Sequence, residues 1–151
     1  MTGRKKPGNA PRSGGGRPHG SRRPVGDRIV KRIQCALSLD LLHRNYRSRT
    51  KGKKQALVWA TRDHCYVATE AAYHLFGKGL GYEPHARRNA DGSTHWWLRH
   101  LVTGDVIDAT RPQLEGRPYP YKKGHRQPFL TKRPSSRAAE LIRRVRRTMS
   151  R

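Results

Sequence analysis

Three residues in the middle of the chain have side chains suited to thiol-based acyl transfer. Cys65 lies at the start of a predicted helix, His95 begins a predicted strand and Asp108 ends the next strand. A cysteine reacts as its thiolate, and a helix N-terminus favours that negative charge. A histidine can take the thiol proton and later return it, while a carboxylate orients the ring. We therefore predict a catalytic triad of Cys65, His95 and Asp108.

Each member of this triad also has a simpler interpretation. Free cysteines are often small buried residues, so Cys65 could simply pack on an apolar helix face. A histidine beside two tryptophans is commonly a packed ring, and an aspartate at a strand end commonly caps a turn. The order of the three types along the chain favours the catalytic interpretation.

Contact between His95 and Asp108 depends on the length of the turn between their strands. A two-residue turn at 103–104 places Asp108 opposite Arg99, too far from His95 at roughly 3.4 Å per residue. A six-residue loop over 99–104 places Asp108 directly opposite His95. Both registers put His95 and Asp108 on one face of the sheet, because the registers differ by an even number of residues and side chains alternate between the two faces. The triad therefore predicts the longer loop.

Hydrophobic periodicity indicates the elements that must position these residues. The predicted helices run from Asp27 to near Tyr46, from after Asp63 to the glycines of 77–81, and over 135–149; the predicted strands cover 82–88, 95–98 and 105–108. The residues expected on buried faces are Ile29, Ile33, Ala36, Leu37, Leu41, Ala68, Ala71, Ala72, Leu75, Phe76, Ala138, Leu141, Ile142, Val145 and Met149.

These elements indicate one α+β domain over residues 27–151 preceded by a basic arm over 1–26. The arm consists mainly of Gly, Pro, Ser, Arg and Lys, a composition typical of disorder. The thiol-enzyme core is expected at about 60–112, with the Cys65 helix packed on a short antiparallel sheet and a helix on either side of it in sequence. The segment 111–128 has little periodicity and is expected to contribute loops that set substrate specificity.

The order of motifs resembles that of the transglutaminase-like, papain-fold enzymes. Their pattern of Cys, His-x-Trp and Asp-Pro-Thr corresponds to Cys65, His95 with Trp97, and Asp108 with Thr110, although Ala109 stands where that family usually has proline. The resemblance covers about fifty residues and implies a papain-like fold and a cysteine hydrolase or acyltransferase acting on an amide bond. The segments 64–68 and 129–135 are also similar to small proteins of bacterial viruses, which implies a host cytoplasm as the setting.

An acyl-transfer site of this kind also needs donors for the oxyanion and a groove for the substrate. The Cys65 backbone N–H is the expected first donor, and Trp59 and Gln55 are candidates for the second. Trp96 and Trp97 point to opposite faces of one strand, so one is expected in the core and the other in the groove, with Trp97 the groove candidate.

The charge of the chain gives an alternative function. Thirty-four Lys and Arg against ten Asp and Glu give a formal net charge of +24, which attracts polyanions such as DNA or RNA. The alternative is therefore a non-enzymatic, basic nucleic-acid-binding protein. Its candidate contact residues are Arg143, Arg144, Arg146 and Arg147 in the last predicted helix, with Tyr119 and Tyr121 stacking on bases. A solvated basic surface without a ligand is the simpler interpretation.

No metal site or cofactor is predicted, because the histidines and the two cysteines, Cys35 and Cys65, lack zinc-binding spacings. Glu70 is expected to pair with a base at the surface. No apolar run is long enough for a signal or a membrane span, so the expected setting is cytoplasmic, with a protein or peptide substrate.

Overall fold

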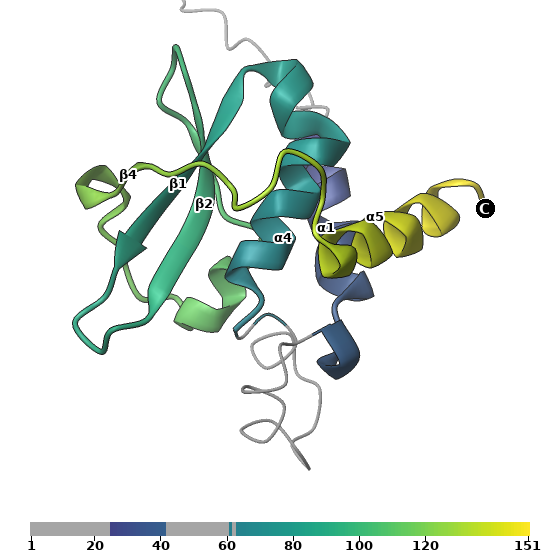
Figure 1. The fold of residues 1–151 in the computed structure, drawn as a ribbon, viewed down its shortest axis with the longest axis horizontal. Helices are drawn as coiled ribbons and strands as arrows, with labels where there is room; N and C mark the ends of the chain where they lie inside the picture. The colour runs from purple at the N-terminus through teal and green to yellow at the C-terminus, as the bar shows by residue number, and fades with distance from the viewer. Residues whose placement is uncertain (1–24, 42–60, 62) are drawn as a thin grey trace, which may run out of the picture.

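The fold combines helices with one small antiparallel sheet, as the predicted α+β class requires (Figure 1). The structure, a computed structural model, describes residues 25–41, 61 and 63–151. The helices are α1 (Val25–Ala36), α4 (Cys65–Ala72) and α5 (Ser136–Met149). The strands are β1 (Tyr82–Arg88), β2 (Thr94–His100), β3 (Val106–Ile107) and β4 (His125–Arg126), in the order β3-β2-β1-β4.

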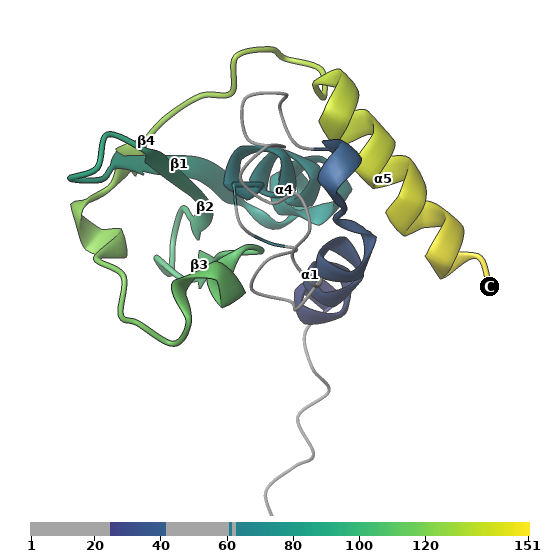
Figure 2. The ribbon, with the colours of Figure 1, turned by 90° about the horizontal axis from the view of Figure 1, so that it is seen from below.

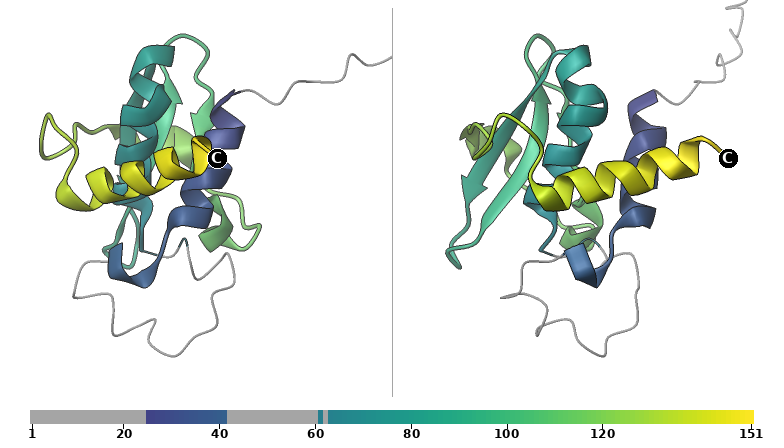
Figure 3. Two further views of the ribbon diagram at one scale, coloured as in Figure 1. Left: turned by 90° about the vertical axis from the view of Figure 1, so that its right-hand side faces the viewer. Right: turned by 45° about the vertical axis from the view of Figure 1, so that its right-hand side comes forward.

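The helices lie on one side of the sheet (Figure 2). Helix α4 packs against β2, and α1 and α5 pack against α4 from its other side. The two outer helices cross each other next to α4, as Figure 3 shows. Within the described ranges, no helix has the length and apolar character needed to cross a membrane.

Most residues expected on buried faces do form the core between these layers. Ile33, Ala68, Ala71, Leu141 and Val145 have no exposed surface. Ala36 and Leu75 are only partly buried. The prediction for Met149 is wrong, because this residue lies in the last turn of α5 and is 51% exposed.

The first helix ends ten residues earlier than predicted, at Ala36. A short 3-10 helix, Leu39–Leu41, follows it. Between them the Ser38 hydroxyl donates to the Asp40 carboxylate, a local contact that competes with continued helix formation. The predicted helix beyond position 41 and the predicted basic arm up to position 24 lie outside the described residues.

The helix that begins at Cys65 continues past α4 and tightens at its end. A π-helical turn, Tyr73–Gly77, and a 3-10 turn, Lys78–Leu80, lead to Gly81, whose φ of +80° ends the helix in the left-handed region. A Cβ at Gly77 would lie 2.8 Å from Leu98 Cδ1 on β2. This glycine therefore allows the helix to approach the strand that carries His95.

The turn between β2 and β3 has a register that neither sequence interpretation predicted. Leu98 pairs with Ile107 and Arg99 with Val106, so four residues, 101–104, form the turn. Continuing this register places Asp108 one step beyond β3, diagonally across from His95. Diagonal neighbours in a sheet are within reach of extended side chains. The six-residue loop was wrong, but the predicted shared face was correct.

The segment expected to be loops also contributes to the sheet. Its residues form two 3-10 turns, Arg111–Leu114 and Tyr121–Lys123, and then β4, which pairs with β1 at His85 and Ala86. A Cβ at Gly124 would lie 2.1 Å from the Trp97 ring. The chain thus crosses directly over a tryptophan of β2, and only glycine fits there.

Glu70 is buried, which contradicts its predicted place at the surface. Its side chain is completely shielded from solvent and accepts hydrogen bonds from Ser135 N at 3.0 Å and Ser135 Oγ at 2.6 Å. Ser135 Oγ also accepts from Ala138 N at 3.3 Å, so Ser135 is the N-cap of α5. Glu70 therefore ties the middle of α4 to the start of α5.

Candidate active site

The structure brings Cys65, His95 and Asp108 together. His95 Nε2 lies 2.7 Å from Asp108 Oδ2, and the side chain of Cys65 lies close enough to His95 to raise the pKa of the ring. Cys65 Sγ also lies 3.4 Å from the backbone oxygen of Thr94, to which its thiol can donate. His95 and Asp108 are buried, whereas Cys65 is only partly buried and remains accessible. The arrangement therefore has a reachable thiol in front of a shielded base and carboxylate.

The charged forms of the buried pair stabilise each other. Burial alone would lower the pKa of His95, but the hydrogen bond with Asp108 and the adjacent negative charges of Asp108 and Cys65 raise this pKa to about 9. Burial alone would raise the pKa of Asp108, but the hydrogen bond and charge of His95 keep it below its ordinary value. Asp108 is therefore ionised at neutral pH and favours a protonated His95.

Further hydrogen bonds hold the Asp108 carboxylate in place. Thr110 donates to Asp108 Oδ1 from its backbone nitrogen at 2.9 Å and from its hydroxyl at 3.1 Å. The Tyr121 hydroxyl donates to Asp108 Oδ2 at 2.7 Å. Burial and the nearby Asp108 charge raise the pKa of Tyr121, so its hydroxyl keeps the proton that it donates. These bonds fix the carboxylate that orients His95.

Gln113 contacts the second nitrogen of His95 and was not foreseen from the sequence. Gln113 Oε1 accepts from Asp63 N at 3.3 Å, which orients the amide. Gln113 Nε2 then lies 3.1 Å from His95 Nδ1 and 3.0 Å from Thr110 Oγ1. The amide thus connects the turn before the Cys65 helix to the ring of His95.

This contact defines two competing states of the ring. When Gln113 donates to Nδ1, His95 is neutral and carries its proton on Nε2, facing Asp108. When His95 is protonated on both nitrogens, Nδ1 cannot accept from Gln113. The Gln113 amide and the proton from Cys65 therefore compete for the same nitrogen.

Because Gln113 stabilises the neutral ring, its removal should raise the pKa of His95. We expect Gln113→Met in a Cys65→Ala background to raise this pKa by about half a unit to one unit, the equivalent of one hydrogen bond. The measurement is an NMR titration of the imidazole nitrogens of both proteins. An unchanged or lowered pKa in the Gln113 variant would show that the amide does not oppose protonation.

Aromatic residues enclose the base. The Trp97 ring stacks on His95 with 6.0 Å between ring centroids, and Tyr119 meets His95 edge-on at 4.7 Å. Trp97 is completely buried and packs against the His95 ring. The prediction that Trp97 lines an open groove is therefore wrong. Tyr119 also donates to Asn89 Oδ1 at 2.7 Å. Tyr119 and Tyr121, expected to stack on bases, therefore lie beside the triad.

The remaining predicted site residues are the oxyanion candidates and the arginines of the last helix. Trp59 and Gln55, the candidates for the second oxyanion donor, lie outside the described residues. The candidate arginines of the last helix, Arg143, Arg144, Arg146 and Arg147, are all on α5. No group of three or more His, Cys, Asp or Glu that could hold a metal ion occurs in the described part of the chain.

Comparison with known proteins gives no relative from which to transfer a function. The sequence matches no protein-family model, and no curated protein or solved structure is significantly similar to it. The functional interpretation therefore depends on the geometry of the site.

Proposed function

We propose that the protein is a cysteine-dependent hydrolase or acyltransferase that acts on an amide bond through Cys65, His95 and Asp108. The observation that supports this most strongly is the 2.7 Å contact between His95 Nε2 and Asp108 Oδ2, with Cys65 beside the same ring. Because Nε2 faces the carboxylate, Nδ1 is the nitrogen that exchanges a proton with the thiol. This division of roles is what a thiol nucleophile and its base require.

The proposed reaction proceeds through a thioester. The Cys65 thiol gives its proton to His95 Nδ1, and the thiolate adds to the carbonyl carbon of the substrate. When the tetrahedral intermediate collapses, the carbon–nitrogen bond breaks and His95 returns the proton to the leaving amine. Water or a second amine, deprotonated by His95, then attacks the thioester and releases Cys65 as a thiol.

The start of α4 supplies the electrostatic support for the intermediate. The first N–H groups of a helix have no acceptor within the helix, so the Cys65 N–H can donate to the oxyanion. Asp108 keeps its charge throughout and stabilises the imidazolium that forms. The motif order resembles that of the transglutaminase-like, papain-fold enzymes, which favours an amide in a protein or peptide as substrate.

Acylation by an active ester tests this proposal, and Cys35 provides a control within the same molecule. Cys35 is exposed on α1, whereas Cys65 is only partly exposed, so access alone favours Cys35. We expect p-nitrophenyl acetate to acylate Cys65 at least roughly tenfold faster than Cys35 at neutral pH, because only Cys65 has an adjacent base. Mass spectrometry of peptides after short exposure measures both rates.

Three variants test whether His95 activates the Cys65 thiol. Cys35→Ser should leave the rate at Cys65 unchanged, and Cys65→Ala should leave only the slow reaction at Cys35. Equal rates at the two cysteines, or a Cys65 rate unaffected by His95→Ala, would count against the proposed function.

A further inference from the structure

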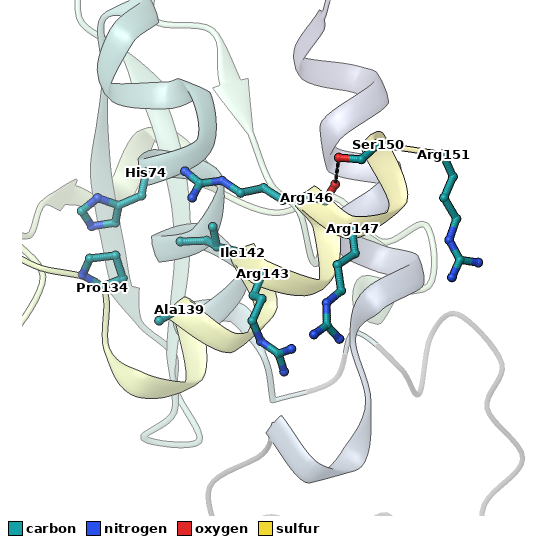
Figure 4. A pocket seen from close by; sticks show the side chains of 9 residues that line it. All are labelled: His74, Pro134, Ala139, Ile142, Arg143, Arg146, Arg147, Ser150 and Arg151. Atoms are coloured by element: carbon teal, nitrogen blue, oxygen red, sulfur yellow. Dashed lines mark hydrogen bonds between the residues drawn. The ribbon is translucent and has the colours of Figure 1, made fainter.

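A second feature lies on α5, away from the triad. Figure 4 shows an open hollow in which Arg146 extends toward His74 while Arg143 and Arg147 extend in another direction. The lining residues are His74, Pro134, Ala139, Ile142, Arg143, Arg146, Arg147, Ser150 and Arg151. Four of the nine are arginines and none is acidic, so the hollow is strongly positive.

Two of the α5 arginines already have acidic partners. Arg144 Nη2 lies 2.5 Å from Asp40 Oδ2, and Arg144 Nε lies 2.8 Å from Glu140 Oε1. Arg143 Nε donates to Glu140 Oε2 at 2.8 Å. Arg144 also donates to Ser38 Oγ at 2.6 Å, so it fastens α5 to the segment after α1. Arg144 therefore has a structural role, and the charge of Arg143 is partly neutralised.

The other three arginines that line the hollow have no acidic partner among the described residues. Arg146, Arg147 and Arg151 are exposed, and none forms an ion pair with any residue that the structure describes. Arg146 and Arg147 are in the last turn of α5, and Arg151 follows shortly after the helix ends at Met149. Guanidinium groups bind phosphate oxygens through two parallel hydrogen bonds, so this trio suits a row of phosphates.

The surroundings of the trio favour nucleic acid over a lipid surface. The apolar face of α5, formed by Ala138, Leu141, Ile142 and Val145, is buried in the core and cannot insert into a membrane. The hollow has no Trp, Tyr or Phe in its lining and His74 is the single aromatic ring there, so stacking on successive bases has little support. Contacts would therefore be made to the backbone, and a duplex offers phosphates at the highest density.

We propose that Arg146, Arg147 and Arg151 bind the phosphate backbone of double-stranded nucleic acid without reading its sequence. This binding site is separate from Cys65 and does not depend on the proposed catalytic function. The net charge of +24 gives long-range attraction, and these three arginines supply the contact.

Fluorescence anisotropy with a labelled DNA duplex of about 20 base pairs tests this site on the full chain. The variant is Arg146→Gln with Arg147→Gln and Arg151→Gln. Each phosphate contact contributes about 0.9 to the slope of log affinity against log salt, so the triple variant should lower the slope by roughly 2 to 3. At physiological salt its affinity should fall at least roughly tenfold.

A charge-matched variant distinguishes this site from general attraction. Arg88→Gln with Lys122→Gln and Lys123→Gln removes three exposed positive charges from the sheet side of the molecule. We expect it to weaken binding by less than about threefold, because it leaves Arg146, Arg147 and Arg151 in place. Equal losses in the two triple variants would overturn the proposal, as would absence of duplex binding by the wild type.

Competition identifies the class of partner. An excess of poly-L-glutamate, matched in total charge to the duplex, should displace little of the bound DNA, because a duplex carries its phosphates at a higher charge density, about one per 1.7 Å of its axis. Displacement as effective as that by unlabelled duplex would overturn the proposal in favour of an acidic protein partner. Circular dichroism melting of both variants checks that the exposed substitutions leave the fold intact.

Discussion

Replacing His95 with alanine is expected to slow the alkylation of Cys65 by iodoacetamide at about pH 6 by roughly 100-fold. An ordinary thiol is less than about 1% ionised at this pH, so its reaction is slow. In the wild type, His95 with its raised pKa of about 9 can hold the thiol proton and leave a thiolate. The measurement is the rate of modification followed by mass spectrometry.

Cys35 again supplies the comparison within each sample. It lies on α1 and has no part in the triad, so its alkylation rate should be the same with and without His95. If the Cys65 rate in the wild type equals that in His95→Ala, the thiol is not paired with the ring. The proximity of the three side chains would then be structural only.

The second large effect is a difference in how the rates of two alkylating agents at Cys65 depend on pH. Iodoacetate is negatively charged and should react fastest while His95 is protonated. Its rate at Cys65 should therefore fall as the pH rises through about 9, the pKa of His95, because the attracting charge is lost. Iodoacetamide is neutral and should show no such fall, so the ratio of the two rates measures the charge state of His95.

Asp108→Asn should move this fall in the iodoacetate rate toward lower pH. Asparagine can still accept a hydrogen bond from Nε2, but it lacks the negative charge that raises the pKa of His95. Loss of one adjacent opposite charge corresponds to a shift of roughly one to two pKa units. A fall that stays near pH 9 in this variant would show that Asp108 does not control the charge on the ring.

The positions of Cys65, His95 and Asp108 were predictable because local patterns place each of them. Helical periodicity put Cys65 in the first turn of a helix, and alternation with a turn put His95 on a strand. Parity then placed His95 and Asp108 on one face for any turn with an even number of residues, so the choice between the two predicted registers did not matter for this conclusion. The register was wrong because a four-residue turn has no stronger sequence signal than its neighbours.

Gln113 and Glu70 could not be assigned from the sequence because their partners are distant in the chain. Glu70 contacts Ser135, sixty-five residues later, and Gln113 contacts Asp63, fifty residues earlier. No periodicity encodes such contacts, and an acidic residue on a helix is ordinarily exposed. The strand β4 was missed for a similar reason, since only two residues pair with β1.

The hydrogen bonds between Glu70 and Ser135 also set the geometry between the two proposed surfaces. Cys65 and Glu70 are five residues apart on one helix, a rise of about 7.5 Å, and Glu70 holds the first turn of α5. The thiol and the arginine-bearing helix are thus parts of one rigid unit. A substrate attached to a duplex held on α5 would meet Cys65 at a raised effective concentration, so the molecule would select substrates by their location as well as by their chemistry.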